Sequence, residues 1–594
     1  MTTYSAPSRD MRFVIEELAG LGQINALPQY QEASADLVEA VLEEASRLAG
    51  EVLAPLNKTG DLQGARIVDG EVKVAEGFAD AYRQFVEGGW NGLSFSPEHE
   101  GQGLPALVGT AVQEMWQSAN MAFALCPMLT QGAVEAVEAH GSEALKETYL
   151  AKLVSGEWTG TMNLTEPQAG SDLSAVRSRA VPEGEHYRVT GQKTFITWGD
   201  HDVAENVVHL VLARLPDAPE GTRGISLFLV PKYLPDPDGN PGERNDVHPV
   251  SLEHKLGIHA SPTCVMSFGD QGGAVGYLLG EANQGLACMF TMMNHARLTV
   301  GLQGLAIAER AYQQARDYAR ERIQGGAPGQ PGRVTIIHHP DVRRMLMQMR
   351  ATTEAMRAVA YVTAGHMDLA HSAEDAAERA RHRARVDLLT PVVKGWCTEI
   401  AQEVTSLGVQ VHGGMGYVEE TGAAQHFRDA RITTIYEGTT GIQALDLAGR
   451  KILRDRGAAA RELIEEMRQT VADLDQQPEL ATALAPALTD SVNALAEAVD
   501  WLVEKGPADP NVAGAVAVNL MMLTGTALGL WQLARGAQVA SRKLAAGDGE
   551  PEFLRAKLVT ARFYAEQIAP RCGAHLRAVL SGAEATMALP EGQF

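Results

Sequence analysis

Apolar residues recur every three or four positions over much of the first 160 residues, which is the period of an amphipathic helix. The segment 106–140 is also helical in pattern and is unusually apolar. Before that segment, residues 60–74 are rich in glycine and predict an exposed loop or hairpin. In residues 34–53 the positions that share one helix face are Leu37, Val38, Val41, Leu42, Ala45, Leu48 and Ala49.

The pattern changes between about residues 160 and 280. Short runs of β-branched and aromatic residues replace the helical period, and glycine and proline separate them. We therefore predict a β domain inserted between helical domains. The predicted strands include residues 187–189, 207–213, 225–230 and 264–268.

Helical periodicity returns from Leu286 onward, with long helices over 297–324 and 341–366 and a Gly/Pro-rich break at 325–332. We predict a mainly α protein with an inserted β domain. Its expected parts are an N-terminal extension (1–33), an N-terminal helical domain (34–159), the β domain (160–280), a helical domain (281–449) and an extra C-terminal helical domain (450–594).

The net charge of the chain argues against one class of partner, nucleic acids. The chain has 74 acidic and 50 basic residues, for a net charge of −24. Binding to nucleic acid requires clustered Lys and Arg, so a nucleic-acid partner is not expected. The five cysteines are scattered and the N-terminus lacks a signal-peptide pattern, which together favour the cytoplasm.

Residues 510–534 carry no charge and are numerous enough to cross a bilayer. Polar residues such as Asn519 and Gln532 interrupt the run, and Gly514, Gly525 and Gly529 dilute it. We therefore predict a buried helix of a large helical domain and no integral membrane segment.

Several common catalytic motifs are absent from the sequence. It contains no HExxH, no zinc-type Cys/His spacing, no GxxxxGK[ST] and no GxSxG. His338 and His339 have no spaced partners, so we expect them to be structural and we expect no metal site. The glycines at 413–416 do not match GxGxxG, which leaves a Rossmann-type site unsupported.

Three segments remain as candidates for chemistry. Residues 164–172 (LTEPQAGSD) with 191–197 (GQKTFIT) combine hydroxyls with glycines that allow a ligand to approach the backbone. Residues 410–417 (QVHGGMGY) form a glycine loop whose amides can bind phosphate oxygens. In residues 435–440 (IYEGTT), Glu437 lies among apolar and aromatic neighbours that can raise the pKa of a carboxyl group.

Taken alone, the first segment is as compatible with a turn and strand as with a ligand site, and the other two fit a helix cap and a capping acid better than a functional site. Together, their order and spacing resemble the acyl-CoA dehydrogenase family over roughly residues 34–450. The opening 4–13 (YSAPSRDMRF) and the extra C-terminal domain resemble the family's large bacterial branch, which includes long-chain and 3-(methylthio)propanoyl-CoA dehydrogenases.

The resemblance implies FAD as cofactor. Thr197 is expected to hydrogen-bond near flavin N5, and Arg322 to hold the pyrophosphate of a neighbouring subunit's FAD. Gln410, Gly413 and Gly414 correspond to the adenosine-side loop, and Thr439 follows the catalytic dipeptide. The residues expected near the flavin ring and pyrophosphate are Leu164, Thr165, Gly170, Ser171 and Ile196.

By the same resemblance, Glu437 is the base that removes the thioester α-proton while the β-hydrogen leaves as hydride. Some relatives place the base directly before the arginine that appears here as Arg297, but the preceding residue is Ala296, which cannot accept a proton. Asn294 stands where many relatives have an acid. The expected substrate contacts are Ser171, Asn294, Arg297, Tyr436 and Gly438.

The resemblance implies an acyl-CoA substrate, an electron transfer flavoprotein as electron acceptor, and a homodimer. Residues 120–131 are expected to form part of the acyl pocket wall. We expect a medium-to-long straight-chain substrate, with 3-(methylthio)propanoyl-CoA as the alternative. An acyl-CoA oxidase and a non-catalytic DNA-binding relative are further alternatives; the second requires a basic C-terminal domain, which residues 461–490 do not provide.

Overall fold

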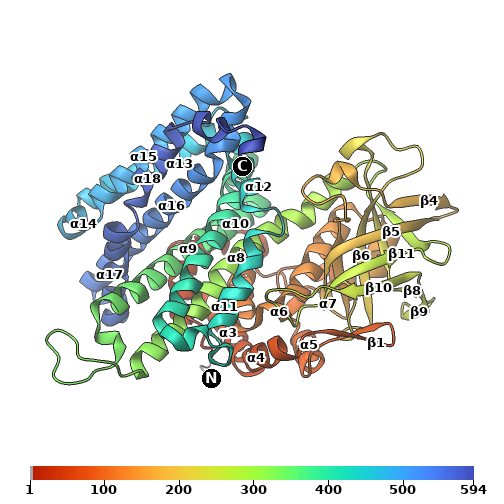
Figure 1. The fold of residues 1–594 in the computed structure, drawn as a ribbon, viewed down its shortest axis with the longest axis horizontal. Helices are drawn as coiled ribbons and strands as arrows, with labels where there is room; N and C mark the ends of the chain where they lie inside the picture. Colours follow the sequence, from red (N-terminus) through yellow and green to blue (C-terminus); the bar gives the residue numbers. More distant parts are fainter. Residues whose placement is uncertain (1–3) are drawn as a thin grey trace. The chain divides into compact units, whose positions relative to one another are not determined.

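The computed structural model describes residues 4–594, and residues 1–3 of the predicted N-terminal extension lie outside that range. Two compact units are present (Figure 1). Unit 1 comprises the chain up to Glu43, Pro105–Glu114 and Val300–Phe594; unit 2 comprises Glu44–Leu104 and Met115–Thr299. Three of the four boundaries fall inside helices, namely α3 (Ala35–Arg47), α6 (Ala106–His140) and α8 (Gly285–Glu321), and the fourth, between Leu104 and Pro105, lies just before α6.

The centre of unit 2 is an eight-stranded sheet with the order β10-β11-β5-β12-β7-β6-β3, and β4 also pairs with β5. The β3–β6 pair is parallel, and the other pairs are antiparallel. Its strands are β3 (Trp158–Asn163), β4 (Arg179–Glu183), β5 (His186–Thr197), β6 (Asn206–Ala213), β7 (Ser226–Pro231), β10 (Val247–Leu252), β11 (Thr263–Phe268) and β12 (Ala274–Leu279).

Every residue of β6 and β7 is buried, which explains why both strands are almost continuously apolar instead of alternating. A hydrophobic core inside the sheet contains Val189, Ile196, Val211 and Phe228. The four predicted strands are present, although β5 is much longer than the three residues expected. The sequence pattern missed β3, because its Thr-Gly-Thr centre has little β-branched character beyond two threonines.

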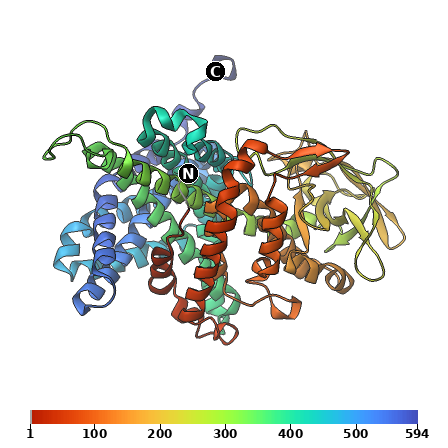
Figure 2. The ribbon, with the colours of Figure 1, turned by 90° about the horizontal axis from the view of Figure 1, so that it is seen from below.

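The rest of unit 2 consists of helices and two small hairpins. The Gly-rich segment 60–74 forms the end of one helix and the hairpin β1–β2, which is visible in Figure 2. The bounds are α4 (Ala54–Gln63), β1 (Arg66–Val68), β2 (Glu71–Lys73), α5 (Phe78–Glu87), α7 (Glu143–Ser155), β8 (Tyr233–Pro235) and β9 (Pro241–Arg244).

Unit 1 is helical. The long helices α9 and α10 pack along each other, and α16 contacts both of them (Figure 1). The loop between α8 and α9 extends beyond the helices in Figures 1 and 2. The helices are α1 (Ser8–Glu17), α2 (Leu21–Ile24), α9 (Pro340–Ser372), α10 (Ala376–His412), α11 (Ala423–Ala430), α12 (Thr440–Leu445), α13 (Ala458–Asp475), α14 (Pro478–Ala483), α15 (Ala485–Lys505), α16 (Pro510–Ala546), α17 (Pro551–Gln567), α18 (Arg571–Leu580) and α19 (Glu584–Met587).

Helix α16 contains the uncharged run that is long and apolar enough to cross a membrane by length and composition. In this structure 67% of its apolar window is buried, against helices such as α15, α17 and α18. Its glycines explain the close packing. A Cβ atom on Gly525 would lie 2.1 Å from Cγ of Trp396 on α10, and one on Gly529 would lie 2.5 Å from the Tyr564 hydroxyl. The run is therefore a core helix of unit 1, as predicted.

Candidate active site

The segment 164–172 leaves the end of β3 in unit 2 and is organised around one buried carboxylate. Glu166 accepts hydrogen bonds from the backbone N–H groups of Arg177 (2.7 Å) and Ser178 (3.0 Å) and pairs with Lys193 Nζ at 2.8 Å. Burial by itself would raise the pKa of Glu166, but the Lys193 ammonium and these hydrogen bonds lower it to about 2. Glu166 is therefore ionised and holds the loop in place.

This pairing brings two predicted ligand-binding segments together. Lys193, on β5, also donates to the Leu164 carbonyl (3.1 Å), and the backbone N–H of Thr194 donates to the Thr165 carbonyl (2.9 Å). The loop 164–172 is thus fastened to the end of β5 that carries Thr197. Gly170 and Ser171 are exposed on it, and a Cβ atom at Gly170 would meet nothing within 4 Å.

The exposed side chain at the end of β5 is Phe195, not Ile196. The Ile196 side chain belongs to the buried sheet core, so only its backbone is available to a ligand. Phe195 is 64% exposed and has φ +59°, a left-handed conformation that is unfavourable for an aromatic residue. An exposed ring on a strained backbone next to Thr197 indicates a binding surface. In the sequence, Phe195 was marked only by its position inside the candidate segment 191–197 (GQKTFIT).

In unit 1, the segment 435–440 joins a short 3-10 helix (Arg431–Thr434) to α12. Glu437 has φ +54° and Gly438 has φ +88°, so the chain holds two successive left-handed residues at the candidate base. Thr439 begins the next helix, and its hydroxyl accepts a hydrogen bond from the N–H of Ile442 (3.3 Å). A left-handed Glu is a strained conformation that neighbouring groups must stabilise.

Buried side chains from three helices provide that stabilisation. Lys394 of α10 is fully buried and donates to the carbonyls of Thr433 (2.8 Å) and Gly438 (2.6 Å), on both sides of Glu437. Gln443 of α12 donates to the Glu437 carbonyl (3.1 Å). The Tyr436 hydroxyl donates to Gln303 of α8, and burial raises the Tyr436 pKa, so the phenol stays protonated.

The remaining predicted cofactor residues of unit 1 lie at two helix ends. Gln410 is in the last turn of α10, and Gly413 and Gly414 follow it, with open space where a Cβ would lie. Arg322 follows the end of α8 and is exposed. The rings of Tyr318 (α8) and His412 (α10) stack with centroids 4.4 Å apart, which joins these two helix ends.

Of the predicted substrate residues, two lie on the first part of α8 in unit 2. Asn294 is exposed, whereas Arg297 is buried with its guanidinium 5.9 Å from the Phe290 ring centroid.

The segment 120–131, which we expected in the acyl pocket wall, begins at a kink of α6. The Asn120 side chain stabilises this kink, because it accepts a hydrogen bond from the Phe123 N–H (3.1 Å) and donates one to the Leu53 carbonyl (3.3 Å).

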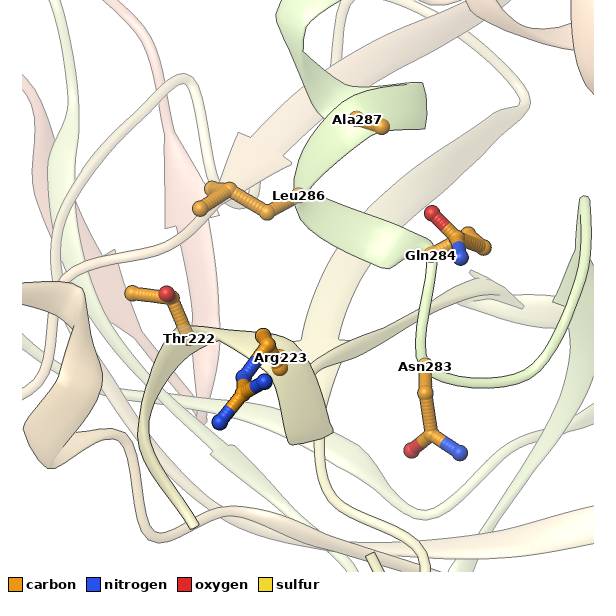
Figure 3. Close-up of a pocket in the computed structure, with 6 residues that line it drawn as sticks. All are labelled: Thr222, Arg223, Asn283, Gln284, Leu286 and Ala287. Atoms are coloured by element: carbon orange, nitrogen blue, oxygen red, sulfur yellow. The ribbon is translucent and has the colours of Figure 1, made fainter. Parts of the chain in front are cut away.

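Unit 2 also contains a pocket of about 360 Å³ that the sequence did not indicate (Figure 3). It lies at the start of α8, and Asn283 there has φ +66°. Arg223 is exposed on the opposite wall, and the Asn283 side-chain oxygen is buried without a hydrogen-bond partner among the described residues. The lining residues are Thr222, Arg223, Asn283, Gln284, Leu286 and Ala287.

Four sequence profiles match the chain in succession: the acyl-CoA dehydrogenase N-terminal domain (residues 36–157), its middle domain (161–271), its C-terminal domain (283–452) and the acetyl-CoA dehydrogenase C-terminal-like domain (463–590). This chain belongs to the acyl-CoA dehydrogenase family. It is a flavin-dependent oxidoreductase, and the predicted mainly α fold with an inserted β domain and an extra C-terminal helical domain is confirmed.

Individual relatives extend over nearly the whole chain. A 3-methylmercaptopropionyl-CoA dehydrogenase of Ruegeria pomeroyi is 52% identical over 96% of this chain and 97% of its own length. The broad-specificity linear acyl-CoA dehydrogenase FadE5 of Mycobacterium tuberculosis is 35% identical over 96% of both chains. An acyl-CoA dehydrogenase of Bacillus anthracis complexed with FAD shares the fold, with a TM-score of 0.74 at 21% identity, covering 96% of this chain and 91% of that one.

The residues of this acyl-CoA dehydrogenase fit the family's cofactor, FAD. Its isoalloxazine ring needs an open apolar surface, which Phe195 presents, and its pyrophosphate needs unobstructed backbone amides and a cation. In unit 2, Gly170 leaves such space. In unit 1, taken by itself, Gly413 and Gly414 leave it too, and Arg322 is an exposed guanidinium.

Proposed function

We propose that this enzyme oxidises 3-(methylthio)propanoyl-CoA to its trans-2-enoyl thioester, with Glu437 as the base. The main support is the 52% identity to a 3-methylmercaptopropionyl-CoA dehydrogenase across 96% of this chain and 97% of that protein's length. For this reason we propose the alternative substrate in preference to the medium-to-long straight-chain acyl group that the sequence favoured.

The proposed chemistry begins at the substrate α-carbon. The Glu437 carboxylate takes the α-proton, and the electron pair moves toward the thioester oxygen, where negative charge develops. The backbone N–H of Glu437 is the donor that the family resemblance assigns to this oxygen. Because Lys394 and Gln443 fix the carbonyls around Glu437, the N–H keeps its orientation and needs no reorganisation during the reaction.

FAD, when bound, would supply the hydride acceptor that lets the β-hydrogen leave with its electron pair as the double bond forms. We propose that Leu164, Thr165, Gly170, Ser171 and Thr197, with the backbone of Ile196, hold the flavin side. We assign Arg322, Gln410, Gly413, Gly414 and Thr439 to the pyrophosphate and adenosine side. The exposed Phe195 ring adds an apolar surface for the isoalloxazine.

We further propose that the pocket at the start of α8 receives the nucleotide end of CoA (Figure 3). A CoA nucleotide carries three phosphate groups, and the pocket offers a guanidinium (Arg223), amides (Asn283, Gln284) and the N-terminus of a 37-residue helix. The unpaired Asn283 oxygen can accept a hydrogen bond from an adenine amino group.

For the rest of the substrate, the proposed contacts remain Ser171, Asn294, Arg297, Tyr436 and Gly438.

The experiment that tests the substrate is anaerobic bleaching of the purified flavoprotein by a series of acyl-CoAs. The series contains 3-(methylthio)propanoyl-CoA, butanoyl-CoA, octanoyl-CoA and palmitoyl-CoA. We expect the thioether substrate to give the largest kcat/KM. Faster bleaching by octanoyl- or palmitoyl-CoA would instead favour the second candidate, a broad linear acyl-CoA dehydrogenase, which the 35% identity to FadE5 supports.

The Glu437→Gln variant tests whether Glu437 is the base without removing the FAD and substrate binding sites. It keeps the size of the side chain but cannot take a proton, so we expect turnover to fall by at least about 10⁴-fold while FAD and substrate still bind. Flavin absorbance measures the cofactor content, and single-turnover bleaching measures the chemical step. Retained bleaching would assign the base to another residue.

Replacement of Arg223 tests the CoA pocket. Arg223→Gln removes one charge-assisted contact, so we expect KM for the CoA thioester to rise about tenfold with little change in kcat. Arg66→Gln, which removes an exposed arginine of β1, is the matched control and should leave KM unchanged. The corresponding pantetheine thioester lacks the nucleotide and should not distinguish wild type from Arg223→Gln. An equal loss with both thioesters would contradict the assignment.

We propose an electron transfer flavoprotein as the electron acceptor, and a homodimer as the assembly. Reoxidation of the bleached enzyme distinguishes the dehydrogenase from an acyl-CoA oxidase. A dehydrogenase is reoxidised by the flavoprotein in the absence of oxygen, whereas rapid formation of hydrogen peroxide in air would identify an oxidase.

A further inference from the structure

Two histidines fasten the first part of α8 to α6 in unit 2. His140, the last residue of α6, bonds through Nε2 to the Thr291 hydroxyl (2.8 Å). One turn further along α8, His295 Nδ1 lies 2.8 Å from a carboxylate oxygen of Glu135 on α6. The side chains of His295 and Glu135 are 14% and 33% exposed, so solvent screens their contact only in part. The two helices are therefore joined by one neutral contact and one contact that can carry charge.

The helices pack closely between these two contacts. Met292 of α8 has no exposed surface, and a Cβ atom at Gly132 of α6 would lie 2.9 Å from its Cγ. Met292 and His295 are three residues apart, so they share the face of α8 that meets α6. At 100° per residue, the proposed substrate contacts Asn294 and Arg297 lie on the opposite face. Helix α6 thus supports α8 from behind its substrate face.

Glu135 decides the charge of His295. Burial by itself would lower the pKa of the imidazole, but the Glu135 carboxylate and the hydrogen bond to it raise this pKa above its ordinary value. The other ionisable groups nearby on the two helices, Glu138, His140 and Arg297, do not contribute to the shift. The second ring nitrogen, Nε2, is buried without a hydrogen-bond partner within residues 4–594. The contact with Glu135 alone therefore orients the ring.

We infer that His295 and Glu135 are positioning residues for the acyl-CoA, and that protonation of the imidazole strengthens their contact. The inference rests on the proposed function, which makes Asn294 and Arg297 substrate contacts. A hydrogen bond between an imidazolium and a carboxylate is roughly twice as strong as a neutral one. Protonated His295 therefore holds α8 more firmly against α6 and keeps the opposite face in place for the substrate. Neutral His295 can still donate from Nδ1, so deprotonation weakens the contact without breaking it.

A pH-dependent KM is the expected signature of this contact. Because the pKa of His295 is raised in the folded enzyme, the strong contact is present below that pKa and is lost as the pH rises through it. We expect KM for the thioester that bleaches the flavin fastest to rise about fivefold across this transition. The transition should be centred above about pH 6.5, the ordinary histidine value, and kcat should not share it.

Variants of the pair separate positioning from a purely structural role. Glu135→Gln keeps a hydrogen-bond acceptor but removes the charge, so the KM transition should move down by at least about one pH unit. The matched control Glu138→Gln removes a charge one turn further along α6 and should keep the wild-type transition. His295→Gln should abolish the transition and show the higher KM at every pH. A purely structural contact would change KM equally at all pH values.

Hydrogen–deuterium exchange at the C2 position of the imidazole, followed by mass spectrometry, measures the His295 titration without substrate. In the FAD-loaded enzyme we expect a midpoint above about pH 6.5, and a midpoint at least about one unit lower in Glu135→Gln. A wild-type midpoint at or below about 6.5, or the same KM profile in wild type and Glu135→Gln, would overturn the inference alone. Failure of every thioester to bleach the flavin would overturn the proposed function, and the substrate role of the pair with it.

Discussion

At the scale of single residues, the candidate base depends on a lysine that the sequence did not single out. Lys394 has no exposed surface, and it donates to carbonyls that precede and follow Glu437. Burying an ammonium is costly, so its retention here needs compensation from these strong charge-assisted hydrogen bonds. We therefore regard Lys394 as a positioning residue for the left-handed Glu437–Gly438 pair.

Lys394→Met should lower kcat about 100-fold with KM within twofold of wild type, because misplacement of a base by about 1 Å costs that much. Steady-state kinetics measure kcat and KM separately, and flavin absorbance measures the cofactor content of the variant. Lys451→Met, at a partly exposed lysine only 4.0 Å from Asp387, is the matched control and should keep wild-type kcat. An unchanged kcat in Lys394→Met would show that Gln443 and the backbone alone hold the loop.

Sequence reasoning identified Glu437, Thr165 and Thr197 because they belong to short contiguous motifs. Phe195, Lys394 and Arg223 escaped it for different reasons. Phe195 lies inside a motif, but its exposure follows from a left-handed φ that sequence does not show. Lys394 and Arg223 act on segments distant in sequence, and a lone Lys or Arg is usually a solvated surface residue.

At the scale of elements, α16 shows why a glycine-diluted apolar run becomes a core helix. At Gly525, α16 lies so close to Trp396 of α10 that a Cβ atom would not fit between them. Gly514, on the same helix, faces open space. The two glycines therefore have different physical roles. One permits close packing, and the other only lowers helix propensity.

These roles predict opposite effects for the same substitution. Gly525→Ala should destabilise the protein by about 2 kcal/mol, because the methyl group overlaps the Trp396 ring. Gly514→Ala should stabilise it by about 0.5 to 1 kcal/mol through helix propensity. Urea unfolding followed by circular dichroism measures both. Equal effects at the two positions would show that Trp396 moves aside at little cost.

At the scale of the whole molecule, a buried charge cluster joins segments of unit 1 that are far apart in sequence. Arg357 of α9 pairs with Asp10 of α1 (2.5 Å), Glu114 of α6 (2.6 Å) and Glu309 of α8 (2.8 Å). Lys557 of α17 pairs with Asp10 as well. The segment that opens the chain is thus fastened to a central helix and to the C-terminal domain through a single carboxylate.

Asp10→Asn should destabilise the protein by about 3 kcal/mol, because it leaves Arg357 and Lys557 buried with one anion fewer. The midpoint of urea unfolding at constant m-value measures the loss. Glu16→Gln makes the same change at an exposed position of α1 and should alter stability by less than about 0.5 kcal/mol. A loss below 1 kcal/mol in Asp10→Asn would mean that water or a rearranged side chain compensates.

The sequence by itself determined the order of helical and β segments and the family, and it supplied the residues that we propose for the chemistry, because periodicity and contiguous motifs are local properties of the chain. Tertiary structure alone decided which side of each motif faces a ligand and which distant residues support it. Lys394 behind Glu437 and Glu166 beneath the 164–172 loop are examples. Burial and pairing of charge depend on neighbours that only folding brings together, so no local pattern reveals them.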